Sequence, residues 1–121
     1  MLRHKTLVDV LGQVNTDGIS SAMLFNKEGT LLAFNGTKEA KGNQSVSAAL
    51  LAGIWNSFEQ GDLQEAIITL TEGSIIVVPV ANMLLSLKAN NETQIGMLKL
   101  KAKALAKHLE EPITIISKDS L

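Results

Sequence analysis

The segment from Ser45 to Phe58 contains no charged side chain. Its apolar residues recur at helical spacing and Ser45 is a common helix-capping type, so we predict a helix over residues 46–60. A helix that is apolar on nearly every side must be buried on nearly every side. A chain of 121 residues is too small to surround such a helix, so the segment favours a fold in which a second polypeptide covers it. The alternative is a core helix covered by the loop at residues 35–44.

The predicted helix has two apolar faces. Leu50, Ile54 and Phe58 recur at i, i+4 and i+8, and we expect this stripe to cover a β-sheet. Leu51 and Trp55 point well away from the stripe, and a tryptophan is a typical anchor of a protein interface. The remaining apolar positions are small enough to let another backbone come close, namely Ala48, Ala49, Ala52 and Gly53. We therefore predict that this helix forms a partner interface.

The patterns along the rest of the chain predict an α+β fold in a single domain, residues 1–121. Short loops join the strands, which favours antiparallel pairing. The predicted order is α-β-β-α-β-β-β-α, a five-stranded antiparallel sheet with helices on both faces. The other predicted helices cover residues 3–14 and 93–111, and the predicted strands cover residues 19–26, 30–34, 66–71, 74–80 and 83–88.

Turn and breaker residues mark the predicted boundaries. Lys27-Glu28-Gly29 and Glu72-Gly73 are hairpin turns, and Gly61-Asp62 closes the uncharged helix. Pro112 is expected to kink or end the last helix. Pro79 lies inside a predicted strand, and because proline has no N–H to donate, we expect a bulge or an unpaired site there.

The predicted strand at residues 66–71 follows the uncharged helix and interrupts the order of the sheet. We therefore expect it at a sheet edge, where Ile67, Thr69 and Thr71 form a β-branched row suited to pairing. An edge strand beside an apolar helix can extend its sheet into a second subunit. The alternative is an internal strand that pairs only within this chain.

Composition narrows the classes of function. The formal net charge is -1 and the isoelectric point about 6.1, whereas a general nucleic-acid binder should be basic. The chain has no cysteine, which excludes a disulfide framework and a cysteine zinc site. No apolar run approaches the ~20 residues needed to span a bilayer, and no signal peptide is evident. We expect a protein of the cytosol.

Sequence motifs of catalysis are missing, since neither a phosphate-binding loop nor a dinucleotide fingerprint occurs. His4 and His108 are the only histidines, and they lie on different predicted helices. We expect neither to be catalytic or metal-binding. The sequence therefore predicts no catalytic, cofactor-binding or metal site, and a protein that is not an enzyme.

Lysines recur along the last predicted helix, where Lys99, Lys103 and Lys107 are spaced at i, i+4 and i+8. Such a stripe could meet acidic lipid or an acidic partner. We favour the simpler interpretation, a solvated helix face, because charge runs on helices are usually solvated.

The chain resembles the Roadblock family of small dimerising domains, and within it the Roadblock subunits of Ragulator (LAMTOR) complexes. The likeness runs from Met1 to about Ile116, and its specificity lies in covering the chain in order. The segments that carry it are MLRHKTL at 1–7, VLGQVNT at 10–16, NKEGTLLAF at 26–34, Ile54-Trp55 with Phe58-Glu59, VANMLL at 80–85, GMLK at 96–99 and LEEP at 109–112.

The resemblance implies a non-catalytic scaffold that pairs with a paralogous Roadblock subunit, so that two five-stranded sheets join. It implies that a lipidated scaffold subunit ties the complex to the cytosolic face of the late endosome, lysosome or vacuole. There the complex would hold Rag GTPases for amino-acid signalling to TOR complex 1. No cofactor, nucleic acid or direct membrane insertion is implied. Mapped by position, the partner interface would comprise Ala48, Leu51, Ala52, Trp55, Ile67, Thr69 and Thr71.

Two departures from the family pattern stand out, a short connection at residues 59–65 and Pro79 in a strand. One different interpretation stays within the family: a homodimeric Roadblock protein that serves as a dynein light chain or a small-GTPase regulator. Arg3 is the only arginine that could act as an arginine finger, and it lies in a terminal helix. We therefore favour the small-GTPase regulator less than the dynein light chain. A ligand-binding sensor of PAS or profilin-like fold and an enzyme are two further interpretations. Because pairing buries the uncharged helix, a homodimer of the isolated chain is a further alternative, and the sequence does not decide between a homodimer and a heterodimer.

Overall fold

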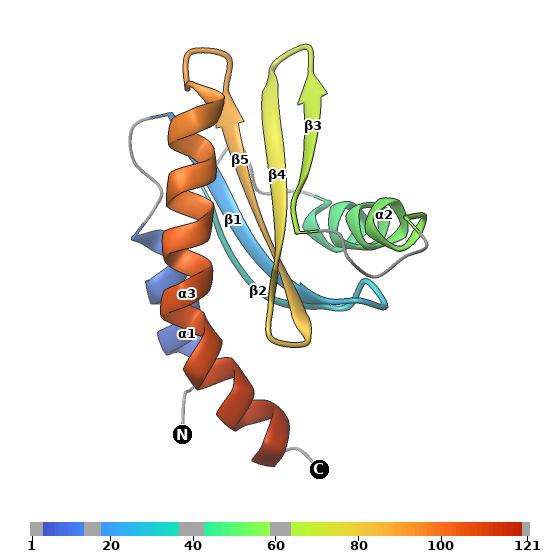
Figure 1. Cartoon of the computed structure of the whole chain (residues 1–121), viewed down its shortest axis with the longest axis vertical. Helices are drawn as coiled ribbons and strands as arrows, with labels where there is room; N and C mark the ends of the chain where they lie inside the picture. The colour runs from blue at the N-terminus through green and yellow to red at the C-terminus, as the bar shows by residue number, and fades with distance from the viewer. Residues whose placement is uncertain (1–3, 14–17, 37–42, 59–63, 120–121) are drawn as a thin grey trace.

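The computed structural model of the chain describes residues 4–13, 18–36, 43–58 and 64–119. A five-stranded sheet forms the middle layer, with two helices on one face and one on the other (Figure 1). The pair on one face is α1 (His4–Gly12) and α3 (Ile95–Asp119), and α2 (Gln44–Asn56) lies on the opposite face. The predicted order of elements and the placing of helices on both faces are confirmed.

All neighbouring strands of the sheet are antiparallel. Their order is β2-β1-β5-β4-β3, so that β5 lies in the centre, between β1 and β4, and β3 lies at an edge, as expected. The strands are β1 (Ile19–Asn26), β2 (Leu31–Gly36), β3 (Ala66–Leu70), β4 (Gly73–Val80) and β5 (Met83–Asn90).

The face of the sheet under α1 and α3 is a continuous apolar core. From α1 it takes Leu7 and Leu11, which lie one turn apart and are buried. From α3 it takes an apolar stripe that begins after the first turn, where Ile95 is 43% exposed. The buried residues of α3 are Leu98, Ala102, Leu105, Leu109 and Ile113.

The bounds of α2 differ from those predicted. The helix begins at Gln44, with Asn43 rather than Ser45 in the capping position, and the Asn43 side chain makes no capping hydrogen bond. It ends at Asn56, where the Ser57 hydroxyl donates to the Ile54 carbonyl at 2.7 Å. The expected helix end at Gln60 and the closing pair Gly61-Asp62 lie outside the described residues.

The last helix continues past Pro112 to Asp119. Proline removes one hydrogen bond of the helix and tends to kink it, and the C-terminal part of α3 changes direction in Figure 1. The chain after Pro112 is therefore further helix rather than an extended tail.

Pro79 fits its strand because, among the strands that the structure describes, none pairs with β4 on one side at that point. Pro79 faces Leu84 of β5 near the end of the hairpin. On the other side β3 begins at Ala66, opposite Val77, so β3 does not reach Pro79. The predicted unpaired site is confirmed, and no bulge is needed.

The turn between β3 and β4 consists of Thr71 and Glu72, and Gly73 is the first residue of β4. A Cβ atom at Gly73 would overlap with the backbone carbonyl oxygen of Ala89. The close approach of β4 to β5 at this end of the sheet therefore requires glycine.

We expect Gly73→Ala to lower the free energy of unfolding by about 1–3 kcal/mol, because strand β4 must move away from Ala89. Gly96→Ala is the matched control. Nothing lies within 4 Å of a Cβ atom there, and alanine in a helix is favoured over glycine by about 0.5–1 kcal/mol. Urea unfolding followed by circular dichroism measures both. Equal stability of the two variants would contradict the packing described for Gly73.

Candidate partner interface

Helix α2 packs on the sheet through an inner face of Ala48, Leu51, Ala52 and Trp55, none more than 8% exposed. The two alanines allow the helix backbone to come close to the sheet, and Trp55 adds the largest side chain of the cluster. The strand residues that complete this second apolar core are Met23, Phe25, Val77 and Leu84. Four of the seven predicted interface residues therefore lie inside this chain.

The opposite face of α2, which we call the outer stripe, is exposed. Its members are Val46 (56% exposed), Leu50 (63%), Ile54 (40%) and, just beyond the helix end, Phe58 (55%). The prediction that Leu50, Ile54 and Phe58 cover the sheet is wrong. Both faces are apolar, so spacing alone does not show which of them packs on the sheet. The face with two alanines does so because its small side chains allow a short distance between helix and sheet. Val46 was not predicted as part of this face, although it begins the same i, i+4 series.

The hairpin between β1 and β2 fixes the position of α2. The Asn56 side-chain amide donates to the Lys27 carbonyl at 2.7 Å. A Cβ atom at Gly29 would lie 2.8 Å from Cα of Ala49, so glycine allows the hairpin to touch the helix backbone. The outer stripe is thus held in a defined direction by contacts at both the sheet and the hairpin.

A groove of about 290 Å³ lies beside α2 on the same face of the sheet. One wall is the helix, with Leu50 and Ile54 of the outer stripe at its edge. The floor is formed by β1, β5 and β4, and it continues to Ile68 and Leu70 of the edge strand. The lining residues of the strands are Ser21, Met23, Phe34, Ile68, Leu70, Ile75, Ser86 and Lys88. The groove and the outer stripe together form one surface.

The remaining predicted interface residues lie at the edge of the sheet. Ile67 is half-buried and packs on the α1/α3 core. Thr69 is exposed near the end of β3, and Thr71 is exposed in the following turn rather than in the strand. The sheet partner of β3 is β4 alone among the described strands, so the edge strand and the groove lie next to each other.

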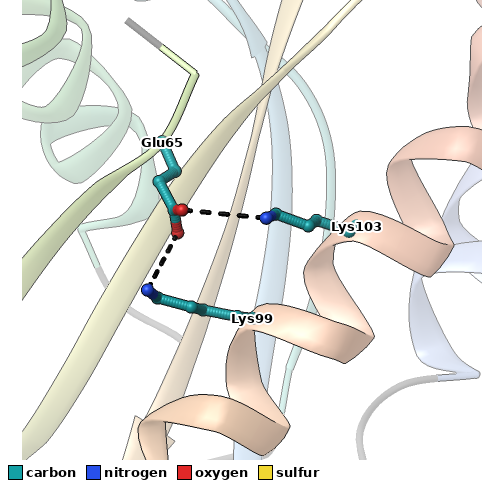
Figure 2. Close-up of polar contacts among 3 residues, drawn as sticks. All are labelled: Glu65, Lys99 and Lys103. Carbon is teal, nitrogen blue, oxygen red and sulfur yellow. Dashed lines mark ion pairs between the residues drawn. The ribbon is translucent and has the colours of Figure 1, made fainter.

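Two of the three lysines in the predicted stripe on α3 form ion pairs within the chain. Figure 2 shows the Glu65 carboxylate between Lys99 and Lys103, with N–O distances of 3.8 Å and 3.7 Å. Glu65 directly precedes β3, so these contacts tie the start of the edge strand to α3. The interpretation of the lysine stripe as a solvated helix face therefore does not account for the ion pairs that Lys99 and Lys103 form with Glu65.

Both histidines belong to helices on the face of the sheet opposite to α2. His108 is exposed on α3, on the other side of the sheet, and His4 begins α1. Within the described part of the chain, His, Asp and Glu side chains form no group of three or more that could hold a metal ion. The helices described here include none long and apolar enough to cross a membrane.

A curated relative matches nearly the whole chain. It is the "Ragulator complex protein LAMTOR2 homolog" of Caenorhabditis elegans, 47% identical over 122 residues, which cover 98% of both proteins. No family model matches the chain.

Solved structures share the fold at lower identity. "MglB with tetrameric arrangement" superposes with a TM-score of 0.77 at 20% identity, covering 98% of this chain and 92% of that one. The Roadblock/LC7 domain from Streptomyces avermitilis gives 0.72 at 18%, covering 88% and 92%. Profilin IB of Acanthamoeba castellanii gives 0.63 at 16%, covering 91% and 98%. These likenesses establish the fold and no more.

The two faces of α2 predict effects of very different size when a side chain is truncated in the isolated chain. Trp55→Ala empties the contact between helix and sheet, and we expect it to lower the free energy of unfolding by about 3–5 kcal/mol. Leu50→Ala removes an exposed side chain, and we expect a change within about 0.5 kcal/mol. Urea unfolding followed by circular dichroism, at a concentration where the chain is monomeric, measures both. A similar loss in the two variants would contradict the assignment of the faces.

Proposed function

We propose, because this chain belongs to the LAMTOR2 family of Roadblock proteins, that it is a non-catalytic Roadblock subunit of a Ragulator complex. The observation that carries the proposal is 47% identity over 98% of both this chain and the LAMTOR2 homolog. Identity at this level along the whole length indicates the same domain with the same role. In this proposal residues 1–121 are one Roadblock domain.

The subunit pairs with a paralogous Roadblock protein through the outer stripe, the groove and the edge of β3. Three contiguous apolar residues of the outer stripe are 40–63% exposed, namely Val46, Leu50 and Ile54. Exposed apolar surface of this kind is unfavourable in water and marks interaction sites. The free edge of β3 adds unpaired backbone groups beside it, and strand addition there would join two sheets.

Within this pairing the seven residues predicted from the sequence have two roles. Four of them pack between α2 and the sheet and so position the helix against the partner without touching it, namely Ala48, Leu51, Ala52 and Trp55. Ile67, Thr69 and Thr71 belong to the edge strand and its turn, where they meet the partner's sheet.

Further partners follow from membership of the complex. A lipidated scaffold subunit ties it to the cytosolic face of the late endosome, lysosome or vacuole, and the complex holds Rag GTPases there for amino-acid signalling to TOR complex 1. The chain itself contributes protein surface rather than chemistry.

Affinity purification of the tagged chain from its own cells, followed by mass spectrometry, tests the proposal. We expect a second Roadblock subunit, a lipidated scaffold and Rag GTPases. Recovery of dynein chains, or of this chain alone, would keep the fold and discard the Ragulator assignment.

A pair of substitutions tests the surface. We expect Leu50→Asp to lose the Roadblock paralogue, because a carboxylate would be buried in an apolar contact. Leu100→Asp is the matched control, since Leu100 is 68% exposed on α3 against 63% for Leu50, and lies across the sheet. It should retain the paralogue. Retention by both variants would exclude the outer stripe as the contact.

A further inference from the structure

Three polar residues of the strands lie in the floor of the groove beside α2, where the apolar residues Met23 and Ile75 also line it. Ser21 of β1 lies directly opposite Lys88 of β5, and Ser86 is two residues before Lys88 on the same strand. Side chains two apart on a strand share a face, and directly opposed residues have Cβ atoms about 4.5–5.5 Å apart. All three residues line the groove, so they form a small polar cluster there.

The polar groups of this cluster are unpaired within the described ranges of the chain. Ser21 and Ser86 are 7% and 3% exposed, and the part of the chain that the structure describes offers neither hydroxyl a hydrogen bond. The Lys88 ammonium group, on a half-buried side chain, likewise has no ion pair among the described residues. Buried polar groups are normally hydrogen-bonded, and buried charges are normally paired. The described residues therefore leave the cluster without a partner when another molecule covers the groove.

Within the described ranges, the elements of a second copy that would face this cluster carry no carboxylate. The wall of the groove and the outer stripe belong to α2, which carries no charged residue, and β3 carries none either. Two copies joined through these elements would bury Lys88 under apolar and neutral side chains. Burying a charge without a partner is strongly unfavourable.

We propose that Lys88, Ser21 and Ser86 form a binding site for a carboxylate side chain of the partner subunit, and that this site favours a non-identical Roadblock partner over a second copy. The inference rests on the pairing proposed above and adds the chemistry of the partner. The occupant is the helix of a Roadblock paralogue that places an Asp or Glu over the groove. The two hydroxyls donate to the carboxylate, and the ammonium group neutralises it.

Self-association of the purified chain provides the first test. Lys88→Leu removes the unpaired charge, and we expect the association constant between copies, measured by sedimentation equilibrium, to rise about tenfold or more. Lys107→Leu makes the same change on α3 and should leave the constant within about twofold. Glu72 lies in the turn after β3, so Glu72→Gln should also leave it unchanged. A fall in that variant would mean that a second copy supplies the carboxylate, which overturns the proposed selectivity.

Binding to the Roadblock paralogue provides the second test. We expect Lys88→Leu to weaken the heterodimer about tenfold by calorimetry, while Lys107→Leu has no effect. Lys88→Glu should weaken it further, and replacing the partner's matching acid by lysine should restore the affinity of that variant.

The outcomes separate this inference from the proposed function. Suppose that Leu50→Asp abolishes the heterodimer, while Lys88→Leu changes neither the self-association constant nor the heterodimer constant by more than about twofold. The proposed pairing surface is then supported, and the proposed carboxylate site is wrong. If the paralogue does not bind the wild-type chain, the proposed pairing fails, and the self-association measurement still decides whether Lys88 opposes a second copy.

Discussion

Ala48 and Ala52 bring α2 so close to the sheet that the chain itself buries Leu51 and Trp55. The remaining features of this side of the molecule follow from that contact. Because the alanine face lies inward, Leu50 and Ile54 must point outward. Because the hairpin touches the helix at Gly29 and Asn56, the helix cannot turn about its axis to hide them. The exposed stripe is thus a consequence of good packing beneath it.

Helices cover the two faces of the sheet to different extents. On one face α1 and α3 together cover the apolar strand residues, and α3 alone has 25 residues to do so. On the other face α2 has 13 residues and leaves a groove beside it that extends to the edge strand. A sheet covered on one side and half-covered on the other is suited to pairing with a second subunit. Glu65 and its two lysines hold the edge strand to the covered side.

Most of the fold could be predicted from the sequence, because the signals there are local. Alternation, turn residues and helical spacing depend on near neighbours, so β1 was predicted at its observed bounds, residues 19–26. Helix ends were less predictable. Asn43 rather than Ser45 precedes α2, since both residue types are common at that position, and α3 runs through Pro112 to the buried Ile113 and beyond. The polar cluster at Ser21, Ser86 and Lys88 had no signal in the sequence, since strand pairing brings together residues that are far apart in the chain.

The sequence by itself determined that α2 is apolar on both faces, and hence that a chain of this size leaves part of the helix exposed. It also determined, through likeness along the whole length, the family to which the chain belongs. Only the tertiary structure decided which face lies inward. Helical periodicity specifies which residues share a face but carries no information on the distance to the sheet. That distance depends on the side chains of β1, β4 and β5 and on the hairpin. A short distance favours the face of α2 that carries Ala48 and Ala52, because small side chains let the helix backbone come close to the sheet.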